Sequence, residues 1–175
     1  MILYPPIQFD ENEWFIIVSL LIVAALFIWL PNRFPPIITV LLLLYIAAVA
    51  IVSDHVLGGA YKKNLYDFQD REKYEWFDVI LQLFVYPLFG YLIYYVYDIW
   101  RQKNWHTIWF IVLATLFSTI FEGISVWFRV FVYTGWNLFY SFLFYLCIIP
   151  ITIFLLEKMQ HYIQRYRRRV KKSAG

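Results

Sequence analysis

An ionisable side chain lies inside an apolar run that is long enough to cross a lipid bilayer. The residue is Glu122, and the run around it extends from Leu116 to Arg129. A charge at the centre of a membrane helix costs roughly 2.5–3.5 kcal/mol on insertion scales, so a carboxyl there normally faces a partner, a cavity or water. Glu122 is therefore the first candidate for a functional group.

Three more polar residues accompany Glu122 at helical spacing: Ser118, Ser125 and Arg129. Intervals of four, three and four residues place all four side chains on one face of a helix. In a structural interpretation, Glu122 pairs with Arg129 or His55, or is protonated and donates a hydrogen bond. In a functional one, Glu122 contacts a ligand or ion or relays a proton, and Arg129 is its partner or an anion contact.

The composition is that of a membrane protein. Hydrophobic residues make up 62% of the chain and charged residues 15%, whereas a soluble domain is about half apolar and a quarter charged. We predict an all-α integral membrane protein, a bundle of five transmembrane helices in a single domain covering residues 1–175. The predicted spans are 14–30, 36–56, 77–100, 107–128 and 137–156, with an interfacial segment at 60–76 and a basic tail at 158–175. Pro87 and Gly90 predict a kink in the third span.

The distribution of Lys and Arg predicts the orientation of this bundle. Five spans place the two termini on opposite sides of the membrane. One side carries Arg33, Arg101, Lys103 and the seven basic residues of the tail, ten in all, and the other side carries five. Because positive charge is enriched in cytoplasmic loops, we predict an outside N-terminus and an inside C-terminus.

This orientation gives every polar residue a depth. The outer half of the bundle then holds the candidate pocket residues Asp54, His55, Asp78, Glu122, Ser125, Arg129 and Asn137. The segment 60–76, which includes Asp67, Asp70 and Glu75, follows the outer end of the second span. We therefore expect a polar pocket that opens to the extracytoplasmic face and is roofed by this segment, with Asp54 as the carboxylate that faces Glu122.

The sequence does not favour a metal site, a cofactor or nucleic acid as a partner. Asp54 and His55 are adjacent on a helix and point about 100° apart, so they do not ligate one ion without further residues. The acids of segment 60–76 do not follow the calcium-loop spacing. The basic tail is typical of a topology signal that also attracts anionic lipid headgroups.

Enzyme motifs are also missing from the sequence. It contains no His-Glu-x-x-His, no Gly-x-Ser-x-Gly and no phosphate loop. This weakens the hypothesis of an enzyme without excluding a membrane enzyme that uses scattered carboxylates.

Several short stretches together carry a resemblance to a known family. They are Leu30-Pro31-Asn32-Arg33-Phe34-Pro35, Asp54 with Leu57-Gly58, Tyr66-Asp67-Phe68, Lys73-Tyr74-Glu75-Trp76-Phe77-Asp78, Phe89-Gly90-Tyr91, Phe121-Glu122 and Tyr133-Thr134-Gly135-Trp136. From about Leu30 to Tyr145 the chain resembles a family of small, uncharacterised multi-pass membrane proteins from spore-forming Gram-positive bacteria. The resemblance implies a bacterial cytoplasmic or spore inner membrane and supplies no catalytic role.

Three functions remain open at this point. The leading hypothesis is a membrane protein that binds a ligand, ion or proton in an outward-facing polar pocket within a transport or sensing assembly. The alternatives are an intramembrane enzyme that acts on lipid or envelope precursors, with Glu122 and Asp54 as acid and base, and a structural or assembly subunit whose polar groups lock helix packing. Five spans are few for a complete transporter, so a homo-oligomer or a larger membrane complex is expected.

Overall fold

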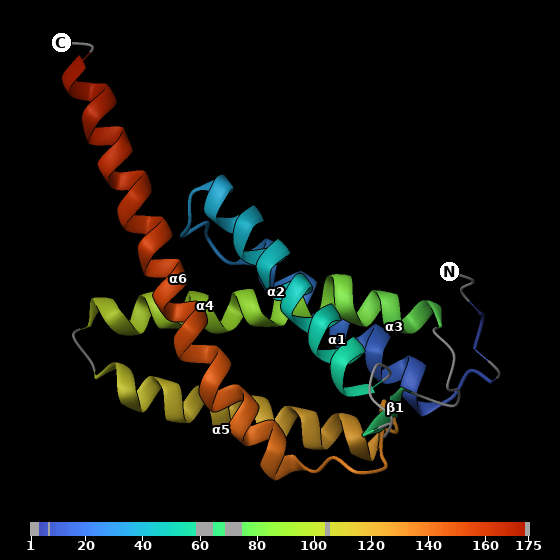
Figure 1. The fold of residues 1–175 in the computed structure, drawn as a ribbon. Helices are drawn as coiled ribbons and strands as arrows, with labels where there is room; N and C mark the ends of the chain where they lie inside the picture. The colour runs from blue at the N-terminus through green and yellow to red at the C-terminus, as the bar shows by residue number, and fades with distance from the viewer. Residues whose placement is uncertain (1–3, 7, 59–64, 69–74, 104–105, 174–175) are drawn as a thin grey trace.

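The computed structural model describes residues 4–6, 8–58, 65–68, 75–103 and 106–173 (Figure 1). Among these residues, five helical stretches are long and apolar enough to cross a membrane: Glu11–Trp29, Pro36–Leu57, Trp76–Gln102, Thr107–Trp127 and Leu138–Tyr166. The five apolar helices predicted from the sequence are therefore confirmed.

Helices α1 (Glu11–Trp29) and α2 (Pro36–Gly58) have well-defined starts. Helix α1 begins with a capping box in which Asp10 accepts a hydrogen bond from the Asn12 amide and Glu13 accepts one from the Asp10 amide. Helix α2 begins at Pro36, where a missing amide hydrogen has no consequence. The connection between them is short and proline-rich, so these two consecutive helices run in opposite directions.

The third apolar stretch contains a widened turn. It consists of α3 (Trp76–Ile80), the π-helix η1 (Leu81–Val85) and α4 (Tyr86–Gln102). Pro87 is the second residue after this turn, and a proline inside a helix removes one hydrogen bond and crowds the carbonyl four residues earlier. A π turn adds a residue and relieves this crowding. The kink predicted at Pro87 thus takes the form of a π turn.

Gly90 also has a role in helix packing. A Cβ atom added at Gly90 would lie 2.9 Å from Cδ1 of Ile46 on α2. The glycine therefore allows α4 to approach α2 closely, which is a common use of small residues in membrane helices.

Helix α5 (Thr107–Trp127) ends in a sharp reversal of the chain. Arg129 has a φ of 55°, in the left-handed region, and the Val130 amide donates to the Ser125 carbonyl at 2.9 Å. The chain then forms β2 (Phe131–Tyr133), which pairs antiparallel with β1 (Tyr66–Phe68). Part of the predicted interfacial segment 60–76 is therefore a short strand that is joined to the loop after α5.

The last helix, α6 (Leu138–Ser173), is longer than the predicted span. Its 36 residues extend about 54 Å at 1.5 Å per residue. The helix continues past residue 156 into the predicted basic tail because the following Glu, Lys, Gln and Arg residues are good helix formers, which hydropathy does not register. Figure 1 shows that this extension carries the C-terminal part of the chain away from the other helices.

The buried side chains form two clusters. The larger joins α2, α4, α5 and α6, and its buried members include Leu42, Tyr94 and Ile149. The smaller joins α1, η1 and the β2 segment through residues such as Ile16 and Val85. The two clusters leave a space between them, which is the candidate site described below.

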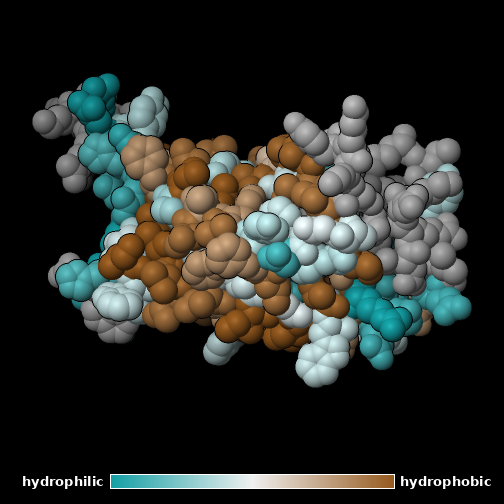
Figure 2. Space-filling model, turned by 60° about the horizontal axis from the view of Figure 1, so that its bottom comes forward, coloured by the Kyte–Doolittle hydropathy of each residue, from teal (hydrophilic) through white to brown (hydrophobic). Residues whose placement is uncertain are grey.

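The outer surface is suited to a bilayer. Figure 2 shows apolar side chains across the middle of one face and hydrophilic side chains at its two ends. Five exposed tryptophans lie near helix ends: Trp14, Trp29, Trp76, Trp109 and Trp127. Tryptophan prefers the boundary between membrane and water, so these positions favour a helical bundle with a membrane-facing belt.

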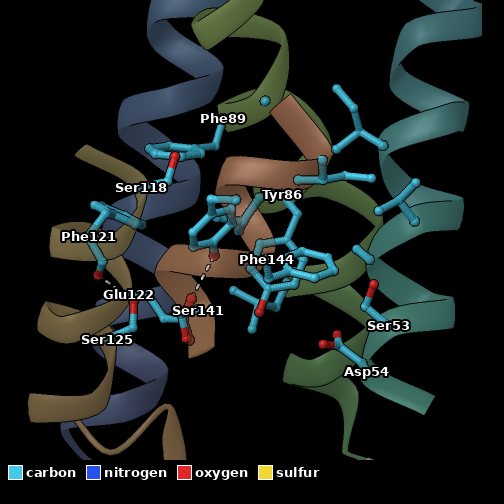
Figure 3. A pocket seen from close by; sticks show the side chains of 18 of the residues that line it. Ser53, Asp54, Tyr86, Phe89, Ser118, Phe121, Glu122, Ser125, Ser141 and Phe144 are labelled. Atoms are coloured by element: carbon cyan, nitrogen blue, oxygen red, sulfur yellow. Dashed lines mark hydrogen bonds between the residues drawn. The ribbon is translucent and has the colours of Figure 1, made fainter. Parts of the chain in front are cut away.

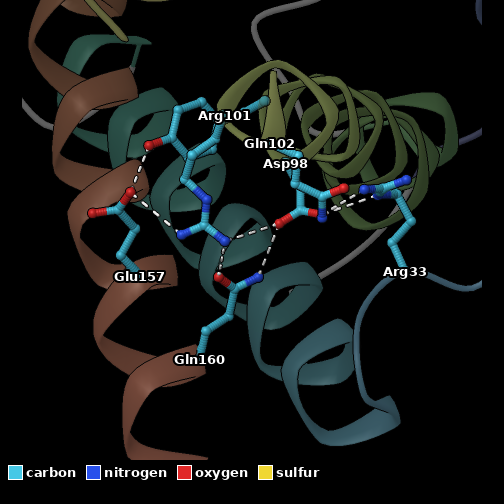
Figure 4. A network of polar contacts seen from close by, with 7 residues as sticks. Arg33, Asp98, Arg101, Gln102, Glu157 and Gln160 are labelled. Atoms are coloured by element: carbon cyan, nitrogen blue, oxygen red, sulfur yellow. Dashed lines mark hydrogen bonds and ion pairs between the residues drawn. The ribbon is translucent and has the colours of Figure 1, made fainter. Parts of the chain in front are cut away.

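A network of charges holds one end of the bundle together (Figure 4). Asp98 on α4 is buried and forms ion pairs with Arg33 at 2.9 Å and with Arg101 at 3.1 Å. Gln102 also donates to Asp98, and Arg101 contacts Glu157 on α6. The network connects the turn before α2 with α4 and α6, and its buried acid is matched by two arginines.

Candidate ligand-binding cavity

A cavity of about 190 Å³ lies between the two buried clusters. Its walls come from all five apolar helices and from the segment that contains β2. Most of the lining is apolar or aromatic, and the polar side chains form small groups on separate walls. An engineered cavity of about 150 Å³ accepts benzene, so this one has room for a molecule built on a single ring.

Figure 3 shows how the polar groups lie around the cavity. Ser118, Glu122 and Ser125 come from α5, while Ser53 and Asp54 lie on the opposite wall, on α2. The side chains of α5 line one wall together because they follow the helical spacing of four and three residues. The two carboxyl groups of the lining therefore lie on different walls of one cavity.

Glu122 is held by three hydroxyl groups. Its Oε1 atom accepts hydrogen bonds from the Tyr133 hydroxyl and from the Ser141 hydroxyl at 2.6 Å. Its Oε2 atom accepts one from the Tyr145 hydroxyl at 2.7 Å. Three neutral donors fix the direction of the carboxyl without supplying a positive charge.

The chain reversal after α5 brings Tyr133 to Glu122. The Leu65 carbonyl accepts hydrogen bonds from the amides of Thr134, Gly135 and Trp136 at 3.0, 2.8 and 2.9 Å, which fixes the backbone that follows β2. Burial, together with the neighbouring charge of Glu122, raises the pKa of Tyr133 above its usual range. The Tyr133 hydroxyl therefore stays protonated at neutral pH and remains a donor.

Helix α6 supplies the other two donors from one face. Ser141 and Tyr145 are four residues apart, so both side chains point toward α5. Trp136 Nε1 donates to the Ser141 hydroxyl at 2.8 Å. This bond orients the serine hydroxyl so that its own hydrogen is directed to Glu122.

Asp54 is held on the opposite wall by an amide. Gln82 Nε2 donates to Asp54 Oδ2 at 2.8 Å, and Gln82 lies in the π turn η1. The widened turn therefore helps to place the donor for the second carboxyl. Gln82 is thus a neutral donor to Asp54, as the three hydroxyl groups are neutral donors to Glu122.

The charged side chains of the described lining are the two acids. None of the residues that border the cavity within the described ranges is Lys, Arg or His. Aromatic rings are plentiful instead. Phe89 and Phe121 stack with ring centroids 4.8 Å apart, and both line the cavity.

Only some of the predicted pocket residues meet here. Glu122, Ser125 and Asp54 line the cavity, whereas Arg129, His55, Asp78 and Asn137 do not. The Ser125 hydroxyl donates to the Phe121 carbonyl at 3.0 Å, within its own helix.

Arg129 does not pair with Glu122. The helical face that joins them in the sequence ends at Trp127, and the left-handed turn at Arg129 leaves its side chain exposed on the surface. His55 is exposed as well. The Asn137 side chain accepts hydrogen bonds from the Phe139 and Tyr140 amides and so caps α6.

Asp78 and Glu75 form a structural cap outside the cavity. Both are buried, and the Glu75 amide donates to Asp78 Oδ2 at 2.7 Å at the start of α3. Asp67 belongs to strand β1, and Asp70 lies outside the described residues. The acids of the predicted roof are thus not shown to contribute to the cavity.

Sequence reasoning missed the donors of Glu122. Ser141 and Tyr145 have the helical spacing of a shared face, a signal that was present in the sequence. Tyr133 and Gln82 had no such signal, because a chain reversal and a π turn place them. No protein-family model, curated protein or solved structure matches this chain.

Proposed function

We propose that this chain is an integral membrane protein that binds a small ligand in the cavity beside Glu122, as part of a transport or sensing assembly. In this proposal the N-terminus is outside, the C-terminus is in the cytoplasm, and the cavity is reached from the outer side. The membrane is a bacterial cytoplasmic or spore inner membrane, as the family resemblance implies. The observation that carries the proposal is a carboxyl whose partners among the described residues are hydroxyl groups, at the edge of a cavity.

The cavity favours a binding role over a purely structural one. A carboxyl that served only to lock helices together would be enclosed by its partners, as Asp98 is by Arg33 and Arg101. Glu122 instead borders about 190 Å³ of space that side chains do not fill. Its three hydroxyl partners hold it in a fixed direction, and a preorganised acceptor loses less entropy when a ligand binds.

Access to the cavity can be tested with single cysteines. We expect Ser118→Cys, in a chain whose exposed Cys147 is replaced by Ala, to react with a small membrane-impermeant thiol reagent added outside right-side-out vesicles. Thr115→Cys in the same background is the matched control, because both residues are buried on the same helix and of the two only Ser118 lines the cavity. The labelling rate at residue 118 should exceed that at residue 115 by at least about tenfold.

Two results would contradict the proposal. Equal labelling of both positions would show that reagent access does not follow the cavity. Labelling of residue 118 only from the cytoplasmic side would contradict the proposed orientation. Labelling should be read by mass spectrometry on protein that elutes as a single folded species.

A further inference from the structure

We infer that the ligand is an organic cation, namely a protonated amine attached to an apolar body about the size of one aromatic ring. This inference rests on the proposed function, since it assumes that the cavity binds a small molecule. It follows from the charge, the aromatic lining, the free acceptor capacity and the size of the cavity.

The charge of the described lining is one-sided. Asp54 and Glu122 are its two acids, and no Lys, Arg or His borders the cavity within the described residues. Electrostatic interactions are far stronger in such a low-dielectric interior than in water. A positive partner stabilises an ionised carboxylate there, and the three hydroxyl groups that bond Glu122 supply hydrogen bonds without charge. An incoming cation supplies the missing charge, whereas an anion is repelled.

The contrast with the other acidic site strengthens this point. Asp98 receives its positive charge from Arg33 and Arg101, both within the protein. The exposed Arg129 is only seven residues from Glu122 in the sequence and still does not contribute. Among the described residues, Asp98 thus has arginine partners, whereas the partly buried Glu122 has hydroxyl partners beside a space that a ligand can enter.

The aromatic lining suits an ammonium group. Tyr86, Phe89, Phe121 and Phe144 line the cavity, and the faces of such rings attract cations. The same rings also contact an apolar body, so one ligand can use both properties. A hydrated inorganic ion would use neither of them.

The described residues also do not favour a metal ion as the ligand. They contain no group of three His, Cys, Asp or Glu side chains close enough to hold one. Most of the cavity wall is apolar, whereas hard metal ions require a shell of oxygen ligands. An organic cation fits a site with two acids and many rings better.

Glu122 retains capacity for one more hydrogen bond. A carboxylate offers about four lone-pair positions. Three are used, two at Oε1 and one at Oε2. An N–H group of a protonated amine can therefore bind Oε2 without displacing Tyr145, so the amine gains a charge-assisted hydrogen bond.

The inference can be tested with three probes of similar shape: phenethylamine, which is protonated at neutral pH, neutral phenethyl alcohol and anionic phenylacetate. Binding to the full chain in lipid nanodiscs is measured by calorimetry, with protein-free nanodiscs as the blank. We expect the amine to bind at least about tenfold more tightly than the alcohol, and phenylacetate to bind most weakly.

Variants test whether Glu122 causes the preference for the amine over the alcohol. Glu122→Gln should bring the affinity ratio of amine to alcohol close to one while leaving the alcohol affinity within about threefold. Tyr145→Phe removes one donor but keeps the carboxyl, so it should retain the preference for the amine. Glu157→Gln, the same substitution at the other end of the bundle, should change neither affinity. Circular dichroism and gel filtration establish that each variant is folded.

The outcomes separate the two proposals. If the alcohol binds as tightly as the amine, the cation inference fails while ligand binding in the cavity stands. If no probe binds, both fail. If folded Glu122→Gln keeps the preference for the amine, the assignment to Glu122 is overturned.

Discussion

Asp98, which is buried, and Glu122, which is partly buried, are acids inside the helical bundle with different kinds of partner. At one end, Asp98 is paired with Arg33 and Arg101 and receives a further hydrogen bond from Gln102. In the other half, Glu122 is bonded by hydroxyl groups alone and borders a cavity. Within the described residues, the first site has two arginines that balance its acid, whereas the partners of Glu122 are neutral donors.

The difference also appears in what surrounds each acid. The partners of Asp98 come from the turn before α2, from α4 and from α6, so the network fastens three parts of the chain together. The partners of Glu122 lie on β2 and α6 only. A site that joins many elements is suited to stability, and a site that leaves one side open is suited to binding.

The largest effect on stability is expected at Asp98. Asp98→Asn removes the charge that pairs with Arg33 and Arg101. Breaking a fully buried pair costs about 3 kcal/mol or more, and the partial exposure of both arginines reduces the expected loss to about 2 kcal/mol. Glu122→Gln should cost less than about 1 kcal/mol, because its hydroxyl partners can also accept hydrogen bonds.

Both variants should be unfolded chemically in the same detergent, with helix content as the readout. An equal or larger loss of stability for Glu122→Gln would show that Glu122 is a structural lock. Both acidic sites would then be structural, and the functional role proposed for Glu122 would be wrong.

The sequence predicted the helices well because hydrophobicity decides where a chain crosses a membrane. The runs around Val40 and Thr115 are apolar over a full bilayer thickness, and both are helical in the structure. It also predicted that Ser118, Glu122 and Ser125 share a face, since helical periodicity alone determines that. All three line the cavity.

What the sequence did not provide were the positions of residues beyond the end of a helix. Arg129 was assigned to the face of Glu122 on the assumption that α5 continues, but α5 ends two residues earlier. Tyr133 comes close to Glu122 because β2 pairs with β1, and Tyr66, the partner of Tyr133 in that ladder, lies far earlier in the chain than any local pattern reaches. Tertiary pairing of this kind leaves no periodic signal in one sequence.

A medium effect on the free energy of unfolding is expected at Tyr133, one of the hydroxyl donors to Glu122. Tyr133→Phe removes one of the three hydroxyl donors and should cost about 1 kcal/mol at neutral pH. The pKa of Tyr133 is raised in the folded state, mainly by burial. The folded chain therefore holds this proton more tightly than the unfolded chain, and its stabilising effect declines as the pH rises above about 10, the usual tyrosine pKa.

The difference in unfolding free energy between the wild-type chain and Tyr133→Phe should accordingly shrink above about pH 10. Comparing the two chains cancels the contributions of the other tyrosines. A difference that grows with pH would indicate that the Tyr133 hydroxyl is ionised in the folded state, and the donor role assigned to it would be wrong.

The smallest effect is expected at Arg129, and it tests whether Glu122 truly lacks a cation. Arg129 has a φ of 55°, and a side chain in the left-handed region is strained by roughly 1 kcal/mol. Because glycine adopts this conformation without strain, Arg129→Gly should leave the protein equally stable or stabilise it by up to about 1 kcal/mol. The preference for phenethylamine over phenethyl alcohol should not change, since the Arg129 side chain is exposed and does not line the cavity.

If Arg129→Gly instead destabilises the protein and strengthens binding of the amine, then Arg129 does compensate Glu122 in solution. The two acidic sites would then differ only in how far their arginines lie from the carboxyl.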